Sequence, residues 1–267
     1  MARSGLVVLL AMAVGCVTPR VKIPHDEGSV VTESQERFAH LPVPPGCVLE
    51  NNVWNDGAAR GPRFQRVYGA NRGGRPVFGW EWRWASNGMV VAYPEVICGA
   101  KPWGPEHTGA AGFPFQVQGR DVTVDFEVLL DATGTYNLAF SMWAVSALPP
   151  RKETITHEIM LHAKPFPSPP PGRTLRPLTV GGVTWDVYVK EGHGDDSGKE
   201  SNEWTLVAFT AREPVLRGPL HVTPFLAHLV QHEVLPPNAW IASLELGNEV
   251  ISGEGWVRVD GFGFTVR

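Results

Sequence analysis

The middle of the chain alternates apolar and polar residues at every second position. Between 122 and 130 the apolar positions are Val122, Val124, Phe126, Val128 and Leu130, with Thr123, Asp125 and Glu127 between them. A period of two is typical of a half-buried strand. Similar runs occur at 136–145, 156–163, 183–190, 204–211, 239–246 and 256–266. Turn-forming residues at 131–134, 165–172, 181–182 and 192–198 are expected to separate them.

One segment has the pattern of a helix. Thr223 can cap it, Pro224 suits its first turn, and the Pro236-Pro237 pair stops it. Its apolar stripe consists of Phe225, Leu226, Leu229, Val230 and Val234. Many strands and a single helix predict an antiparallel β-sandwich with the helix packed on one sheet.

The N-terminus has the pattern of an export signal. Arg3 is followed by an apolar run at 5–14, too short to span a bilayer, and then by Ala-Val-Gly-Cys at 13–16. This resembles a bacterial lipobox, in which Cys16 becomes the lipidated first residue. We expect a signal peptide at 1–16 and an exported lipoprotein of the cell envelope or surface, held to a membrane only by its lipid. An ordinary signal peptide cleaved nearby also implies export, and release outside the cell is an alternative.

The polar, proline-containing stretch at 17–45 is predicted to be a tether, which leaves 46–267 as the folded domain. An exported domain is in an oxidising compartment, so Cys47 and Cys98 are a candidate disulfide pair. Their separation along the sequence does not decide whether they pair. Two isolated cysteines lack metal-ligand spacing, and no metal is expected.

Composition narrows the class of partner. The net charge is −4 and no Lys/Arg cluster occurs, which argues against a nucleic-acid partner. The chain has ten Trp, and flat aromatic side chains stack well on sugar rings. We expect about half of them to fill the core instead.

Two glutamates are candidates for chemistry. Alternation along 157–162 sends Glu158, Met160 and His162 to one face of a strand. A carboxylate in so apolar a strand is costly to bury, so Glu158 is either functional or paired with an arginine. Glu249 lies at a strand end between Gly247 and Gly253, which let a ligand approach. This second signal is weak alone, and three other acids compete with it: Glu203, Glu245 and Glu254.

Six segments in a fixed order carry a resemblance to a known family. They are 51–55 (NNVWN), 80–82 (WEW), 92–103 (AYPEVICGAKPW), 136–140 (YNLAF), 157–161 (HEIML) and 247–249 (GNE). The chain from about Cys47 to Arg267 resembles glycoside hydrolase family 12. The resemblance implies a jelly-roll of two antiparallel sheets with a substrate cleft on the concave one. A xylanase-type jelly-roll is the alternative. It also uses two catalytic glutamates, but it lacks the Asn-Asn-x-Trp motif at 51–54 and the Tyr-Pro pair at 93–94.

The resemblance also implies roles for residues. Glu158 matches the nucleophile and Glu249 the acid/base of a retaining endo-β-1,4-glucanase, which needs two carboxyls about 5–5.5 Å apart and no metal or organic cofactor. Asn52 and Trp54 match residues that hold a sugar beside the cut bond, and Met160 also matches. Trp54, Trp103 and Trp143 are candidate stacking platforms, with core packing as the alternative. The expected partner of a monomeric enzyme is a cellulose-like, mixed-linkage or xyloglucan chain.

Two positions depart from the family pattern. Ser141 stands where the family usually has an Asp that hydrogen-bonds the nucleophile, and a hydroxyl cannot share a proton as a carboxyl can. His162 stands where the family usually has Trp, and we expect it to touch substrate, with a polar filler as the alternative. His157 and His162 face opposite ways, which disfavours metal binding. An altered substrate preference, or a lipoprotein of the same fold that only binds glycan, therefore stays open.

Overall fold

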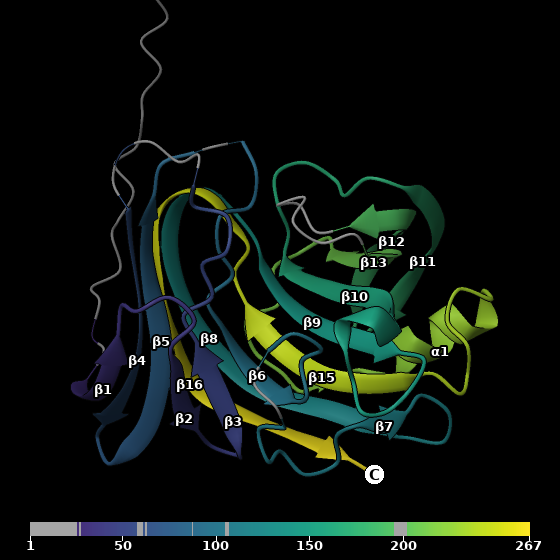
Figure 1. Ribbon diagram of the computed structural model, residues 1–267, viewed down its shortest axis with the longest axis horizontal. Coiled ribbons are helices and arrows are strands. Elements are labelled where there is room, and N and C mark those ends of the chain that lie inside the picture. The colour runs from purple at the N-terminus through teal and green to yellow at the C-terminus, as the bar shows by residue number, and fades with distance from the viewer. Residues whose placement is uncertain are drawn as a thin grey trace, which may run out of the picture.

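The structure is a computed structural model that describes residues 26, 28–57, 61, 63–86, 88–104, 107–194 and 202–267. Two β-sheets pack face to face, and one helix lies at the end of the larger sheet (Figure 1). The predicted all-β jelly-roll sandwich with one packed helix is confirmed. Among the described residues, no helix is long and apolar enough to cross a membrane.

The smaller sheet has six strands in the order β1-β4-β5-β16-β8-β14. Their bounds are Ser29–Ser34 (β1), Arg63–Arg72 (β4), Arg75–Trp84 (β5), Val250–Val266 (β16), Val122–Tyr136 (β8) and Leu220–His221 (β14). This sheet stands at the left of Figure 1. The described pairings within it are all antiparallel.

The larger sheet runs in the order β11-β12-β13-β10-β9-β15-β6-β3-β2, with β7 paired to β15. Its strands are Arg173–Val180 (β11), Val183–Gly194 (β12), Glu203–Ala211 (β13), Ile155–Lys164 (β10), Leu138–Val145 (β9), Trp240–Gly247 (β15), Glu95–Gly99 (β6), Cys47–Glu50 (β3), His40–Val43 (β2) and Phe115–Gln116 (β7). A short 3-10 helix, η1 (Lys152–Thr154), precedes β10.

One pairing in this sheet departs from the antiparallel arrangement expected. Strands β10 and β13 run parallel, with Glu158 beside Leu206 and Met160 beside Ala208. On its other side β10 pairs antiparallel with β9, where Glu158 faces Trp143. Glu158 is therefore flanked by β9, the preceding strand in the chain, and by β13, which lies farther along the sequence.

The turn predicted at 131–134 is wrong, because β8 continues through it to Tyr136. The segment stays extended because β16 pairs with it along this length. Gly134 and Gly253 lie opposite each other with φ of 99° and 106°, and each leaves no room for a Cβ atom against the facing backbone. Here the glycines allow two strands to approach closely, rather than ending them.

The core lies between the two sheets and takes up part of the tryptophans. Trp80, Trp82 and Trp84 enter it from β5 and Trp185 from β12. The helix α1 (Thr223–Gln231) adds Phe225, whose ring lies 5.0 Å from the rings of both Trp185 and Phe209. Thr223 does not cap the helix as predicted, and its hydroxyl instead accepts the backbone N–H of Val122.

The folded part begins earlier than the sequence pattern indicated. Strands β1 and β2 lie within 17–45 and pair with β4 and β3, so the expected tether is wrong over this part of its length. Both lie at sheet edges: the side chains of β1 are almost all exposed, and β2 has only four residues, too few for an alternating pattern to stand out. Residues Cys47 of β3 and Cys98 of β6 form a disulfide. The expected signal at 1–16 with Cys16 lies outside the described residues.

Candidate active site

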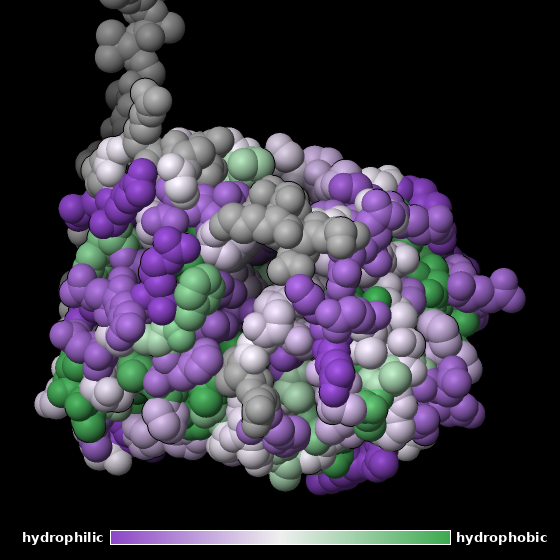
Figure 2. Space-filling view, in the orientation of Figure 1, coloured by the Kyte–Doolittle hydropathy of each residue, from purple (hydrophilic) through white to green (hydrophobic). Residues whose placement is uncertain are grey.

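A cleft with a cavity volume of about 410 Å³ contains both candidate glutamates. Strands β3, β9, β10, β12, β13 and β15 contribute to its lining, together with η1 and segments next to β2, β3, β6, β13 and β15. In the space-filling view, the surface of the molecule is hollowed near its centre (Figure 2). Glu158 and Glu249, 91 positions apart in sequence, are thus brought to one cavity.

Glu158 lies in the middle of β10, with 14% of its side chain exposed. The indole N–H of Trp204 on β13 donates to its Oε2 at 2.9 Å. His193 Nε2, at the end of β12, lies 3.9 Å from the same oxygen. Alternation along β10 places Met160 in the cleft as well, as expected.

Glu249 lies between β15 and β16 and is held by Asn137, a fully buried residue between β8 and β9. The Asn137 amide nitrogen donates to Glu249 Oε2 at 2.5 Å, and its amide oxygen accepts the Glu249 backbone N–H at 2.8 Å. The backbone N–H of Asn137 also donates to the Glu249 carbonyl at 3.1 Å. Of the competing acids, Glu203 and Glu254 are exposed outside the cleft, and Glu254 pairs with Arg83.

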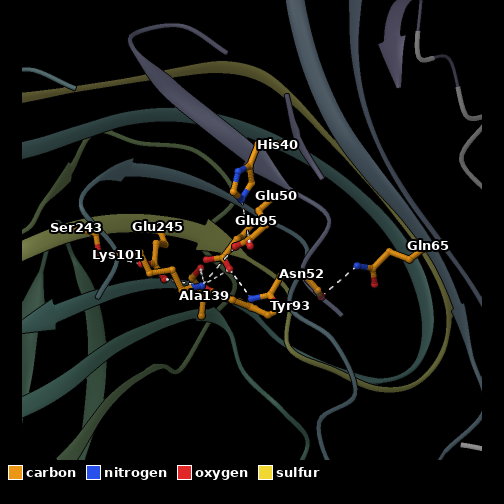
Figure 3. Close-up of polar contacts among 10 residues, drawn as sticks. All are labelled: His40, Glu50, Asn52, Gln65, Tyr93, Glu95, Lys101, Ala139, Ser243 and Glu245. Atoms are coloured by element: carbon orange, nitrogen blue, oxygen red, sulfur yellow. Dashed lines mark hydrogen bonds and ion pairs between the residues drawn. The ribbon is translucent and has the colours of Figure 1, made fainter. Parts of the chain in front are cut away.

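The floor of the cleft beside Asn52 is built from buried charges, which we name the Lys101 cluster: Lys101, Glu50, Glu95 and Glu245 (Figure 3). Lys101 Nζ lies 2.5 Å from Glu95 Oε1, 3.8 Å from Glu50 Oε2 and 3.9 Å from Glu245 Oε2. Asn52 Nδ2 donates to Glu95 Oε1 at 2.9 Å, which fixes the amide that the sequence predicted to hold sugar.

Electrostatics in the Lys101 cluster leave one carboxyl protonated. Burial raises the pKa of Glu95 well above its usual value, against the opposing pull of Lys101. Burial also acts to lower the pKa of Lys101, but the surrounding carboxylates outweigh it and raise that pKa, so Lys101 stays charged. One ammonium cannot hold three ionised carboxylates in a buried site. The fully buried Glu95 is therefore the group that keeps its proton.

Tyr93 lies between the Lys101 cluster and the two candidate catalytic glutamates. Its hydroxyl donates to the Ala139 carbonyl at 3.1 Å. Burial raises the pKa of Tyr93 most, and the negative charges of Glu95, Glu245, Glu249 and Glu158 raise it further. Tyr93 thus stays a protonated donor, and both candidate catalytic carboxyls lie within electrostatic range of it.

Most of the other predicted residues are also in the cleft. Trp54, Trp103 and Trp143 line it, and the exposed Trp103 ring (44%) lies 4.5 Å from the Trp143 ring. Ser141 lines it too, opposite Met160 and Glu245, but its buried hydroxyl makes no hydrogen bond with any described residue. The hydrogen bond that an Asp would give the nucleophile is therefore absent at this position.

His162 is not part of the cleft, so the prediction that it touches substrate is wrong. It shares a strand face with Glu158, but it is 4% exposed and is not among the lining residues. Its ring packs edge-on against Phe166 at 6.3 Å between centroids. Burial lowers the pKa of His162 to about 4, so it is a neutral filler under the end of β10.

Several cleft residues were missed by sequence reasoning: Trp204, His193, Asn137, Lys101, Glu50 and, except as a rival acid, Glu245. Asn137 and Lys101 lie inside the segments 136–140 and 92–103 that resemble the family, and this position could have marked them as candidates. Trp204 and His193 carry none, because only the parallel pairing of β10 and β13 brings Trp204 to Glu158.

Comparison with known proteins identifies the family to which this cleft belongs. The family model "Glycosyl hydrolase family 12" matches residues 45–267. Endoglucanase S of Pectobacterium parmentieri is 26% identical over 216 residues, 79% of this chain and 78% of that protein. The family 12 xyloglucanase from Bacillus licheniformis superposes with a TM-score of 0.78 at 25% identity, covering 88% of this chain and all of that one. Endoglucanase cel12A from Rhodothermus marinus gives a TM-score of 0.71 at 23% identity, covering 88% and 99%.

The chain belongs to glycosyl hydrolase family 12. It is a glycoside hydrolase of the cellulase type.

Proposed function

We propose that this protein is a retaining endo-β-1,4-glucanase, with Glu158 as nucleophile and Glu249 as acid/base. One observation carries the proposal: both carboxyls line one cleft, and each is held by a separate side-chain donor. Trp204 donates to Glu158, and Asn137 donates to Glu249. Two carboxyls with different neighbours can take different protonation states, as the double displacement requires.

The steps follow from these positions. Glu158 attacks the anomeric carbon while Glu249 gives its proton to the leaving glycosidic oxygen, and a covalent glycosyl–enzyme forms. Glu249 then removes a proton from water, whose oxygen displaces Glu158 from the same carbon. The ring faces of Trp54 and Trp103 are suited to stack on glucosyl rings, and Asn52, fixed by Glu95, is suited to bind a sugar hydroxyl.

The proposed substrates are cellulose-like, mixed-linkage and xyloglucan chains. The relatives support this class, since two are named endoglucanases and one a xyloglucanase. Comparing xyloglucan with unsubstituted β-glucan measures whether the cleft accepts side branches. Equal rates on both mean that it does, and loss of rate on xyloglucan means that it does not.

The test is the release of new reducing ends from carboxymethylcellulose, barley β-glucan and xyloglucan. Wild-type protein should release them, and Glu158→Gln and Glu249→Gln should each abolish nearly all release. Glu203→Gln, an exposed change on β13 outside the cleft, is the matched control and should keep full activity. Binding without release on all three polymers would instead support a non-catalytic glycan-binding lipoprotein of the same fold.

We also propose export as a lipoprotein anchored through Cys16, and a monomeric state. The support is the short apolar run at 5–14 followed by Ala-Val-Gly-Cys. Expression in a bacterial host should place the protein in the membrane fraction, and Cys16→Ser should release it. Light scattering of the released domain should give the mass of one chain.

A further inference from the structure

One oxygen of the nucleophile lies beside nitrogens from two neighbouring strands. Glu158 Oε2 accepts the indole N–H of Trp204 at 2.9 Å, and His193 Nε2 lies 3.9 Å from it. The ring of His193 meets that of Trp204 edge-on, with centroids 5.6 Å apart. The two side chains therefore form one unit against Oε2.

The direction of the Trp204 N–H is fixed by packing. Trp204 is 6% exposed, and its ring centroid lies 5.5 Å from that of Trp143 and 5.6 Å from that of Trp103. The parallel register places Leu206 beside Glu158, so Trp204, two residues earlier, shares the same face of β13. A donor held by packing before substrate arrives needs no reorganisation during the reaction.

The neighbour of His193 sets which of its ring nitrogens carries the proton. Lys190 Nζ lies 3.2 Å from His193 Nδ1. An ammonium only donates, so Nδ1 is the acceptor, and in the neutral ring the proton is on Nε2. That nitrogen is the one that faces Glu158 Oε2.

We propose, on the basis of the function proposed above, that Trp204 and His193 are positioning residues for the nucleophile. Trp204 binds Oε2 and stabilises the ionised carboxylate, His193 supports it from the same side, and Oε1 is thereby presented to the anomeric carbon. This arrangement supplies the support that Ser141 does not give, since the Ser141 hydroxyl makes no hydrogen bond within the part of the chain that the structure describes.

The test is the pH profile of Trp204→Phe, which keeps the ring and removes the N–H. Loss of a donor to the charged form raises the pKa of a carboxyl, so the acid limb of kcat/KM should move up by about one pH unit. The kcat should fall roughly 10- to 100-fold, as expected for loss of a hydrogen bond to a charged group, with KM little changed. Lys152 and Glu249 are other ionisable residues of the cleft, and Trp204→Phe does not alter them.

Trp185→Phe is the matched control, because it removes an indole N–H in the core that has no hydrogen-bond partner among the described residues. Its acid limb should coincide with that of wild type. An unmoved acid limb in Trp204→Phe, with thermal stability lowered as in the control, would assign Trp204 a packing role and overturn the proposal.

A pair of variants tests His193. His193→Ala should move the acid limb in the same direction by less than Trp204→Phe does, because the separation from Oε2 is longer. His193→Gln retains an N–H donor and should recover part of the shift. No shift in the alanine variant, or an equal shift in both, would remove His193 from the unit.

A separate readout distinguishes failure of this proposal from failure of the proposed function. A dinitrophenyl 2-deoxy-2-fluoro-β-cellobioside should transfer its sugar to Glu158, as the C1–O bond to the aryl group breaks and dinitrophenolate leaves. Mass spectrometry should find the label on the Glu158 peptide, and Trp204→Phe should be labelled at least tenfold more slowly near the wild-type acid limb. A wild type that neither labels nor releases sugar refutes the proposed function. An active wild type with equally fast labelling of Trp204→Phe refutes the positioning role alone.

Discussion

Asn137 holds Glu249 from two directions, with its amide nitrogen 2.5 Å from Oε2 and its amide oxygen accepting the Glu249 backbone N–H at 2.8 Å. Asn137 is fully buried, and its own backbone N–H donates to the Glu249 carbonyl. Glu249, the proposed acid/base, is thus fixed to the junction of β8 and β9, and β9 is the neighbour of the strand that carries Glu158.

Asn137→Asp should therefore change the pH dependence of the reaction. A carboxylate in place of the amide would lie beside Glu249 and raise its pKa, so the basic limb of kcat/KM should move to higher pH. Asn137→Ala should lower kcat roughly 10- to 100-fold through loss of the donor. Asn71→Ala, at the exposed end of β4 and far from the cleft lining, is the control and should behave as wild type. Unchanged limbs in the aspartate variant would contradict Glu249 as the acid/base.

Removal of Lys101 should destabilise the domain strongly. Lys101→Met leaves the carboxylates of the Lys101 cluster buried without their cation, which typically costs about 3–5 kcal/mol. Urea unfolding should show this as a lower midpoint with an unchanged slope. Glu95→Gln keeps the shape and an acceptor for Asn52, and should cost much less. Arg212→Met breaks only an exposed pair with Asp186 and should leave the midpoint nearly unchanged. A small effect of Lys101→Met would mean that the Lys101 cluster does not need its charge.

The disulfide between Cys47 and Cys98 should contribute to stability through the unfolded state. It closes a loop with a sequence separation of 51, for which the chain-entropy relation gives about 4 kcal/mol. The Cys47→Ala/Cys98→Ala variant should unfold at a lower urea concentration than wild type. Wild type treated with reductant should match the variant, and a midpoint unaffected by reductant would refute the contribution.

Buried His162 should make stability depend on pH. Burial lowers its pKa to about 4 in the folded state, against about 6.5 when unfolded. The unfolded state therefore binds the proton first as the pH falls from about 6.5 to 4, and stability decreases by about 3 kcal/mol over that window. Burial also lowers the pKa of His157 and His228, which act in the same direction.

His162→Leu isolates that contribution. The fall in melting temperature between pH 7 and pH 4.5 should be smaller in this variant than in wild type. The exposed His221→Leu should leave the fall unchanged. Equal falls in wild type and His162→Leu would show that His162 is not buried as described.

Strand alternation was enough to predict the sandwich and the face of Glu158, because each central strand has one face in the core. It could not predict how much of the strand face that carries Glu158 is accessible from the cleft. His162 shares the face of Glu158, yet its ring packs against Phe166, which comes from the segment after β10. The edge strands β1 and β2 were missed for other reasons: the side chains of β1 are exposed along nearly its whole length, and β2 is only four residues long.

The candidate site was predictable where a segment contains its own signal. Glu249 and its neighbour Asn137 both stand in segments that resemble the family, although only the structure shows the contact between them. The donor to Glu158 was not predictable, because Trp204 reaches it through a parallel pairing of strands far apart in sequence. Long-range register of this kind leaves no mark in local periodicity.

Azide rescue of two alanine variants tests the central claim most directly, with an activated dinitrophenyl β-cellobioside as substrate. Glu158→Ala should give the α-cellobiosyl azide, because azide enters from the side left open by the nucleophile. Glu249→Ala should give the β-cellobiosyl azide, because azide then intercepts the glycosyl–enzyme on Glu158. The same anomer from both variants, or the two anomers exchanged, would contradict the assignment of Glu158 as nucleophile and Glu249 as acid/base.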